Sequence, residues 1–242
     1  MNFSQDDLKH FCSQVWQPEF SQNSGGMGPP DLFTLYLTLR KLKPKVVIES
    51  GVWNGISTKL IRRVLPEAII ICLDPRNIPH TGFKDTSINT YYYVGQHFVD
   101  FKNLDLKKYD PKDIFCFFDC HQNMYHRLMQ CQEKKITNVF CNDNYPKGCG
   151  SHFTLTHLIE GDNRNFQVTD TERTTLLQNI ELYYIFPNVY PGNIKTSEGT
   201  FQCLSYFTTS DNTPKEFSIF KETRNTYRWN TFIKLKALGT SI

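Results

Sequence analysis

Five short apolar segments, separated by polar and helix-like stretches, constrain the fold of this chain more than any other feature. The stretch after the first segment, STKLIRRVL, and the stretch after the fourth, HRLMQCQEKK, both have helical composition. Continuous apolar strands that alternate with helices are typical of a parallel sheet covered on both faces. The sequence therefore predicts an α/β fold with a doubly wound, mostly parallel sheet. The five segments are KVVIES (45–50), AIIICLD (68–74), TYYYVG (90–95), IFCFFD (114–119) and NVFCND (138–143).

The region before the first strand predicts two helices joined by a loop. A short helix is expected at the N-terminus, and SQNSGGMGPP (21–30) has the composition of a flexible loop. A second helix is expected over residues 31–42, with leucines on one face and Asp31 as its N-cap. Pro44 ends this helix.

The last hundred residues have weaker patterns. RTTLLQNIELYYIF (173–186) predicts a helix, whereas FQCLSYFTT (201–209) and YRWNTFIKLK (227–236) predict strands that add an antiparallel edge and complete a seven-stranded sheet. We interpret residues 1–242 as a single domain. Its parts are an N-terminal helix and glycine-rich lid (1–30), a core (31–150), and a C-terminal sheet edge with acceptor-side elements (151–242).

The charge and the apolar patterning exclude several classes of protein. A formal net charge of +3, from 27 basic and 24 acidic residues, is too small for a dedicated nucleic-acid binder. The first residues lack the pattern of a signal peptide, and no run approaches the roughly 18 apolar residues of a membrane helix. Eight cysteines occur without a CxxC pair, which argues against a zinc or redox site. We expect a reduced, soluble, cytoplasmic protein that does not bind membranes.

Polar residues gather where the predicted strands end. Because ligands of open α/β sheets bind beyond the carboxyl ends of the strands, these residues are the candidate site. Each acid alone is as well explained by a turn or a helix cap, but the set together favours a ligand site. The strand ends carry Glu49, Ser50 and Gly51; Asp74; Gly95 and Gln96; Asp119 and His121; and Asp143 and Asn144.

The first strand runs into a glycine-containing bend. Gly51 and Gly55 form a GxxxG pattern and not GxGxxG, which weakens a dinucleotide hypothesis but still allows close approach of backbone to a ligand. Asp74, at the end of the second strand, suits a carboxylate that accepts both ribose hydroxyls of an adenosine.

These motifs resemble those of a known enzyme class. VIESGVWNGIST (47–58), followed by ICLD, resembles the first two motifs of class I S-adenosylmethionine-dependent methyltransferases with a Rossmann-like fold. FFDCHQ (117–122) with CNDNYP (141–146) resembles the metal-binding pair of the magnesium-dependent small-molecule and sugar O-methyltransferases. These relatives include the catechol O-methyltransferase, cephalosporin-hydroxylase and macrocin types. The similarity covers about residues 25–150.

The resemblance implies a role for each matching position. Two hard carboxylates and an amide oxygen suit Mg²⁺, which would bind the acceptor hydroxyl and stabilise its alkoxide. The cofactor, S-adenosylmethionine, would contact Glu49, Gly51 and Gly55 beside its methionine part, Ser57 or Thr58 at its carboxylate, Asp74 at its ribose, and Gly95 and Gln96 at its adenine. The metal would be held by Asp119, Asp143 and Asn144.

The general base departs from the family pattern. Catechol-type enzymes carry a lysine three residues after the first metal acid, where this chain has Gln122. His121 is the nearest titratable group, and its ordinary pKa of about 6.5 suits proton abstraction near neutral pH. A histidine that caps the following helix is the alternative explanation. Asp119 and His152 are the other candidates.

Two loops flank this predicted site. GGMGPP (25–30) is a candidate lid that closes over the cofactor, or else a linker from the N-terminal helix. PKGCGSHF (146–153) follows the metal pair and is expected to shape the choice of acceptor.

We therefore expect an O-methyltransferase for a small-molecule or glycan acceptor. An RNA cap or ribose methyltransferase is disfavoured by the lack of a basic aromatic stripe. A non-catalytic domain that keeps the cofactor fold is the other alternative, and a homodimer is left open.

Overall fold

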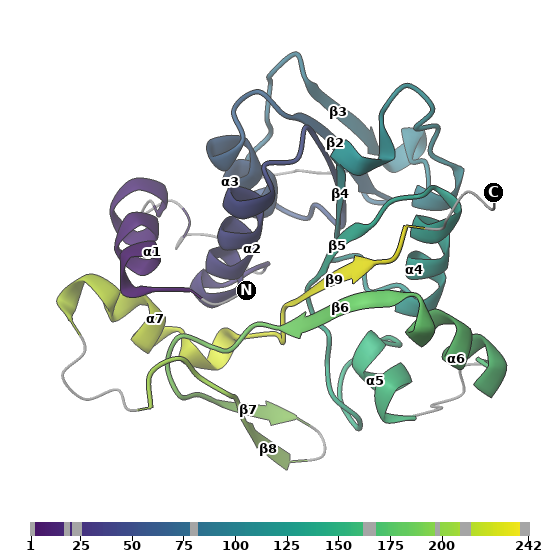
Figure 1. Cartoon of the computed structure of the whole chain (residues 1–242). Coiled ribbons are helices and arrows are strands. Elements are labelled where there is room, and N and C mark those ends of the chain that lie inside the picture. The colour runs from purple at the N-terminus through teal and green to yellow at the C-terminus, as the bar shows by residue number, and fades with distance from the viewer. Residues whose placement is uncertain are drawn as a thin grey trace.

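The computed structural model describes residues 3–16, 20, 26–77, 82–161, 168–196, 199–208 and 214–237, which form a central sheet with helices on both faces (Figure 1). The seven strands lie in the order β3-β2-β1-β4-β5-β9-β6, and all are parallel except β9. This confirms the predicted Rossmann-like, doubly wound fold. The strands are β1 (Val46–Ser50), β2 (Ile69–Asp74), β3 (Thr90–Val94), β4 (Ile114–Phe118), β5 (Asn138–Cys141), β6 (Ile180–Ile185) and β9 (Thr231–Leu235).

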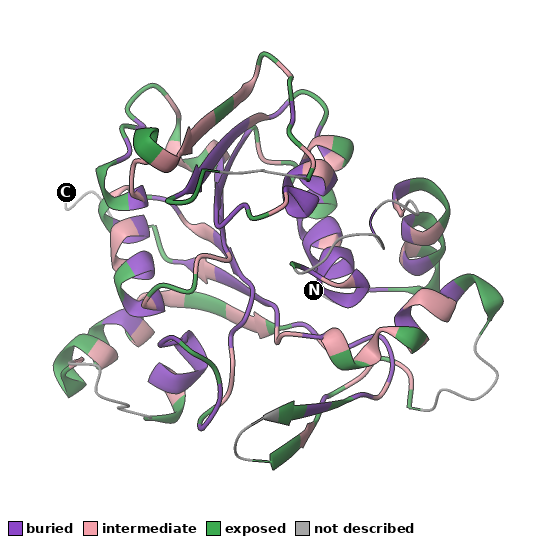
Figure 2. Ribbon diagram, turned by 180° about the vertical axis from the view of Figure 1, so that it is seen from behind, coloured by how far each residue is buried: buried purple, intermediate pink, exposed green. Residues whose placement is uncertain are grey.

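Two apolar cores lie on opposite faces of the sheet, as the alternation of side chains along β4 shows. Phe115 and Phe117 pack on one face, and Cys116 and Phe118 pack on the other. Helices α1 (Gln5–His10), α2 (Pro29–Leu42), α3 (Ile56–Val64) and α7 (Ser218–Glu222) contribute to the first core. Helices α4 (Met124–Glu133), α5 (Leu155–Glu160) and α6 (Asp170–Gln178) contribute to the second, and the buried strands lie between the two layers (Figure 2).

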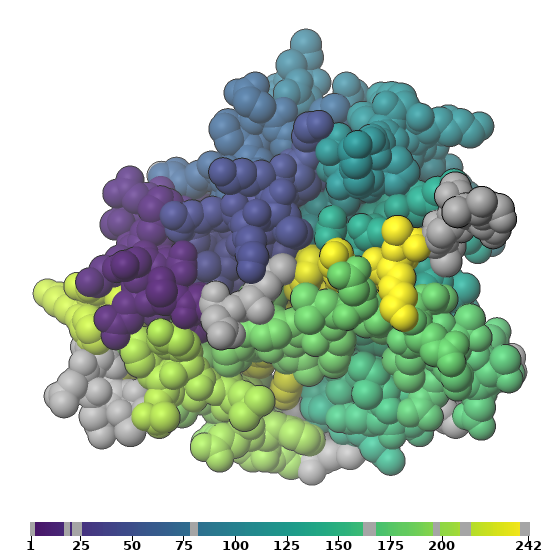
Figure 3. All heavy atoms as spheres, in the orientation of Figure 1, coloured from purple at the N-terminus to yellow at the C-terminus, as the bar shows by residue number. Residues whose placement is uncertain are grey.

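The early and late parts of the chain lie side by side. The rings of Phe11, just after α1, and Phe220 in α7 have centroids 5.8 Å apart. In the space-filling view the N-terminal segment rests against the segment that contains α7 (Figure 3). The C-terminal residues thus complete the core under α2 as well as the sheet.

The antiparallel strand is not at the edge of the sheet, where we expected it. β9 pairs with β5 on one side and with β6 on the other, so β6 forms the edge. The helix predicted over residues 173–186 is also wrong in its second half. α6 ends at Gln178 and β6 begins at Ile180, because pairing with β9 decides the structure of a short segment rich in isoleucine and tyrosine.

Two smaller predictions also need correction. Residue 209 lies outside the described residues, and of residues 201–208 only the first two form a strand. They belong to β8 (Gly199–Gln202), which pairs with β7 (Asn193–Thr196) in a separate hairpin. Asp31 is not the N-cap of α2, because this helix begins at Pro29 and Gly28 is its N-cap. Proline suits the first helical position, since its missing N–H would have no partner there.

The expected flexible loop falls partly on residues 21–25, which lie outside the described residues. Its remaining part is packed: Met27 is buried, and a Cβ on Gly28 would lie 2.3 Å from Oγ1 of Thr226. Within the described part of the chain, no helix is both long and apolar enough to span a membrane.

Candidate active site

Backbone hydrogen bonds fasten the carboxyl ends of four neighbouring strands together. The N–H of Gly51 donates to the carbonyl of Leu73 at 2.9 Å, which joins the ends of β1 and β2. The N–H of Asp119 donates to Ser50 at 2.8 Å, and that of Asn142 donates to Phe118 at 3.0 Å. The sheet order reverses between β1 and β4, so these strand ends lie at the topological switch point where open α/β sheets bind ligands.

Two glycines allow the backbone to pass closely at this point. Gly51 has φ of +95°, and a Cβ there would lie 2.3 Å from the carbonyl oxygen of Asp119. Gly55, the N-cap of α3, has φ of +74°, and its Cβ would lie 2.0 Å from the carbonyl oxygen of Phe83. Side chains at either position would separate the β1 loop from its neighbours.

The side chain of Glu49 points into the protein, where neighbouring hydroxyl groups donate hydrogen bonds to it. It is fully buried at the end of β1 and accepts hydrogen bonds from Thr58 Oγ1 at 2.6 Å and from the Ser57 hydroxyl. Burial raises the pKa of Glu49 to about 7, although both hydroxyls act in the opposite direction. Ser57 and Thr58 are therefore brought together with Glu49, and in this arrangement all three serve the packing of α3 on β1.

Asp74 is also saturated with partners. Its Oδ2 accepts from the N–H of Val52 at 3.0 Å and of Trp53 at 3.3 Å. The guanidinium of Arg76 holds both carboxylate oxygens at 2.9 Å and lies 4.5 Å from the centroid of the Trp53 ring. Burial opposes ionisation of Asp74, but Arg76 and the backbone donors outweigh it and lower the pKa. Sequence patterns did not single out Arg76, because an arginine after a strand is common.

The predicted adenine-side residues lie next to this ion pair. Gly95 donates its N–H to the carbonyl of Arg76 at 3.0 Å. The side chain of Gln96 is exposed and contacts His97.

The ends of β4 and β5 hold a compact polar cluster of Asp119, His121 and Asp143. One ligand-type atom of each lies within 4.8 Å of the others. His121 Nε2 is 2.8 Å from Asp143 Oδ2 and 3.8 Å from Asp119 Oδ1. Burial and then the carboxylate of Asp143 raise the pKa of Asp119 to about 7, and the hydrogen bond to Asp143 raises the pKa of His121.

Asn144 does not join this cluster. Its amide donates to Thr231 Oγ1 at 2.8 Å and to the Tyr183 hydroxyl at 3.0 Å, and its oxygen accepts from the N–H of Thr156 at 3.0 Å. Every polar atom of the Asn144 side chain is thus used to fasten β5 to β6, β9 and α5. The amide beside the cluster is instead that of Asn142, which donates to Asp119 Oδ1 at 3.2 Å.

Several buried polar atoms around the cluster have no hydrogen-bond partner among the described residues. They are Oδ1 of Asp143, Oδ1 of Asn142 and Nδ1 of His152. The ring of His152 stacks on His121 with centroids 5.1 Å apart, and burial lowers the pKa of His152 to about 4. Since buried polar groups normally have partners, these atoms fit a site that receives a ligand. Two carboxylates with an adjacent amide oxygen have the chemistry that Mg²⁺ prefers.

Arg228 is a further residue that sequence patterns did not identify. It precedes β9, and its Nε lies 3.9 Å from Asp143 Oδ1. Its backbone N–H donates to Asp31 Oδ1 at 3.1 Å, so the buried acid of α2 also faces this region. Only the tertiary fold brings residues so distant in sequence together.

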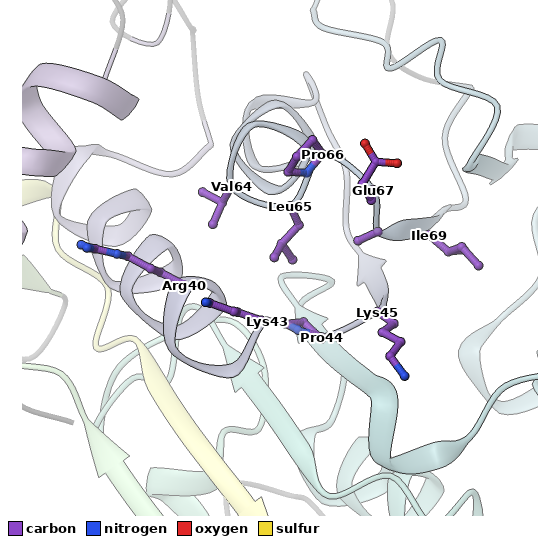
Figure 4. A pocket seen from close by; sticks show the side chains of 10 residues that line it. Arg40, Lys43, Pro44, Lys45, Val64, Leu65, Pro66, Glu67 and Ile69 are labelled. Carbon is purple, nitrogen blue, oxygen red and sulfur yellow. The ribbon is translucent and has the colours of Figure 1, made fainter.

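A separate hollow of about 530 Å³ lies at the opposite edge of the sheet (Figure 4). It is lined by the C-terminal ends of α2 and α3, including Arg40 and Val64, and by Lys45 and Ile69 at the amino ends of β1 and β2. None of the predicted site residues lines this hollow. The candidate site is therefore confined to the carboxyl edge.

Comparisons with known proteins agree with this fold. No family model matches the chain, and no curated protein sequence does so. The O-methyltransferase TomG from Streptomyces achromogenes, solved with SAM, aligns over 96% of each chain at 10% identity with a TM-score of 0.50. The O-methyltransferase from Bacillus cereus, solved with SAH, covers 96% of this chain and 98% of its own at 10% identity, with a TM-score of 0.48.

A putative O-methyltransferase from Klebsiella pneumoniae covers 97% of each chain at 12% identity, with a TM-score of 0.48. At these sequence identities the similarity shows only the fold, and the conclusion rests on the comparison with TomG. The chain shares the overall fold of a solved O-methyltransferase.

Proposed function

We propose that this protein is an S-adenosylmethionine-dependent O-methyltransferase that acts on a hydroxyl of a small molecule, with a sugar or glycan as the preferred acceptor and Mg²⁺ as its metal. The observation that carries the proposal is the convergence of Asp74, Asp119 and Asp143 on the switch point of a sheet with the fold of TomG. The sugar preference rests on the sequence resemblance alone.

In this proposal the cofactor occupies the half of the edge above β1 and β2. Gly51 and Gly55 lie in the loop beside its methionine part, where they let the backbone pack against Asp119 and Phe83, and Gly95 and Gln96 flank the adenine. Asp74 accepts the ribose hydroxyls, which requires the Arg76 guanidinium to release at least one carboxylate oxygen. Because Glu49 already binds Ser57 and Thr58, it acts by shaping the loop. The cofactor supplies an activated methyl group on a cationic sulfonium.

The metal belongs to the half above β4 and β5. Asp119 and Asp143 are the carboxylates that would hold it, and their close approach in a buried place, with Oδ1 of Asp143 accepting no hydrogen bond from a described residue, supports a cation there. When bound, Mg²⁺ would favour the alkoxide form of the acceptor hydroxyl. Asn142 replaces Asn144 as the nearby amide in this proposal.

His121 is the proposed general base. Its Nε2 lies between the two carboxylates, which together favour a proton on the ring. The acceptor hydroxyl would give its proton to the His121 ring as its oxygen bonds to the methyl carbon, and the bond from that carbon to the sulfonium sulfur would break to leave S-adenosylhomocysteine. His152 supports the ring by stacking, and its own low pKa makes it a poor proton acceptor at neutral pH.

Calorimetry with S-adenosylhomocysteine, in Mg²⁺ and again in EDTA, tests both halves. We expect the compound to bind in both conditions, and Mg²⁺ to raise the thermal midpoint of the wild type but not of Asp119→Asn. Failure to bind S-adenosylhomocysteine would refute the proposal.

The alternatives predict other outcomes. A non-catalytic domain would bind the compound yet methylate no acceptor in a panel of sugars and phenols. An RNA methyltransferase would methylate capped RNA in the same assay.

A further inference from the structure

A cavity of about 540 Å³ has Arg228, a neighbour of the acidic cluster, in its lining. This volume is typical of small-molecule sites, which occupy roughly 300 to 1,000 Å³. The cavity lies between the segment that follows β5 and the β7–β8 hairpin, which are neighbours in both ribbon views (Figures 1 and 2). Its lining includes Tyr145, Gly150, Asn193, Lys195, Asn225 and Arg228. We call it the basic cavity.

Two residues connect the basic cavity with the acidic cluster. Arg228 lines the cavity, and its Nε is 3.9 Å from Asp143 Oδ1. Tyr145 also lines it, and its ring centroid is 6.2 Å from that of His152, which stacks on His121. A molecule in the cavity is therefore adjacent to the proposed reaction centre.

The hairpin that forms one wall is fastened to the rest of the fold. Ile194 of β7 packs with Cys203 and Tyr227 in a small core of its own. The N–H of Asn193 donates to Asn225 Oδ1 at 3.0 Å. The wall that carries Lys195 is thus joined to the segment that carries Arg228.

The chemistry of the lining selects one class of ligand. The charged residues in the described lining, Lys195 and Arg228, are both cationic, and no carboxylate lines the cavity with them. Lysine and arginine can only donate hydrogen bonds, so they match a ligand group that only accepts. A neutral sugar would bond only the Tyr145, Asn193 and Asn225 side chains, whereas an anion also offsets the two positive charges. Lys195 forms no salt bridge with any described residue, so its charge is available.

We propose that the basic cavity binds an anionic acceptor, whose carboxylate or phosphate is held by Lys195 and Arg228 while a neighbouring hydroxyl reaches the acidic cluster. This inference rests on the proposed function for the identity of the reaction, but the anion site itself does not. The segment 146–153 contributes Cys149 and Gly150 to the lining, in keeping with its expected role in acceptor choice.

The test compares three probes by calorimetry in the presence of S-adenosylhomocysteine: glucuronate, glucose 1-phosphate and neutral methyl glucoside. We expect at least one anion to bind about tenfold or more tightly than the neutral sugar, and the two anions separate a carboxylate from a phosphate preference. Lys195→Gln should weaken the anion about tenfold and leave the affinity for S-adenosylhomocysteine unchanged. Lys41→Gln, an exposed change on α2, is the matched control.

Equal binding of the neutral and anionic probes, or binding of neither anion, would overturn the inference. An anion affinity unchanged in Lys195→Gln would also overturn it. These results differ from failure of the proposed function, in which S-adenosylhomocysteine does not bind although an anion does. Arg228→Gln is a second variant, but Lys195 decides the outcome because its loss disturbs no described ion pair.

Discussion

The acidic side chains in the two halves of the carboxyl edge differ in the partners that they have. Above β1 and β2, Glu49 and Asp74 are saturated by hydroxyls, backbone N–H groups and the Arg76 guanidinium. Above β4 and β5, Asp119 and Asp143 lie together, and Oδ1 of Asp143 has no hydrogen-bond partner among the described residues. Two carboxylates this close in a buried place repel each other, and a bound cation would relieve that repulsion. The acids of the first half are therefore held by groups of the protein itself, whereas Asp119 and Asp143 in the second half are the candidates to bind a cation.

The largest expected effect is on stability, and it comes from a substitution at Gly51, where the loop after β1 packs against the end of β4. Gly51→Ala places a Cβ 2.3 Å from the Asp119 carbonyl oxygen and forces alanine into φ of +95°. We expect it to lower the free energy of unfolding by about 4 kcal/mol or more, as measured by urea denaturation. Gly199→Ala is the control, because φ there is +131° but a Cβ would meet no described atom within 4 Å. Equal costs at both positions would mean that the close approach is unimportant.

The second prediction concerns how the stability of the protein depends on pH through Glu49, in the half above β1 and β2. Since the folded pKa of Glu49 is about 7 and its ordinary value is 4.5, the folded protein retains a proton that the unfolded chain has lost between those values. Stability should therefore fall as pH rises from about 4.5 to 7, and stay level above that. Relative to Glu49→Gln, the wild type should lose on the order of 3 kcal/mol across this window.

Urea denaturation at pH 5, 6, 7 and 8 measures this difference. The exposed variant Glu67→Gln should keep the wild-type slope. Parallel pH profiles for wild type and Glu49→Gln would show that Glu49 does not titrate in this range.

The third prediction tests whether the acidic cluster above β4 and β5 binds a metal ion. Asp143→Asn removes a charge from the cluster, and we expect Mn²⁺, a spectroscopic substitute for Mg²⁺, to bind about 100-fold more weakly by electron paramagnetic resonance. Asp6→Asn, an exposed acid in α1, should leave the affinity unchanged. If Mn²⁺ bound both variants equally, the cluster would not be a metal site.

The smallest effect concerns the ion pair that covers Asp74. In the proposed complex Arg76 releases an oxygen of Asp74 to the ribose, and this half-exposed pair is worth about 1 kcal/mol at most. Arg76→Gln should therefore tighten S-adenosylhomocysteine up to about fivefold in calorimetry. Lys45→Gln breaks a comparable pair with Asp113 at the far edge and should change nothing. Weaker binding by Arg76→Gln would instead make Arg76 a ligand of the cofactor.

Much of the fold followed from local pattern. The first five strands and the helices between them were predicted within a residue or two, because apolar runs buried on both faces leave few alternatives. The region after residue 170 was harder, since β6 and the β7–β8 hairpin are short and exposed on one side. Their structure depends on partners distant in sequence, and β9 even entered the sheet between β5 and β6.

The candidate site was likewise only partly predictable from the sequence. The sequence by itself determined which acids end the strands, because parallel strands bring their carboxyl ends to one edge whatever the loops do. Only the tertiary structure decided what each side chain does there: it turned Asn144 into the core and Asn142 toward Asp119, and it brought Arg228 to Asp143. Side-chain direction just beyond a strand depends on backbone torsions and on distant partners, as the φ of +56° at Asp143 illustrates, and no local sequence pattern encodes those contacts.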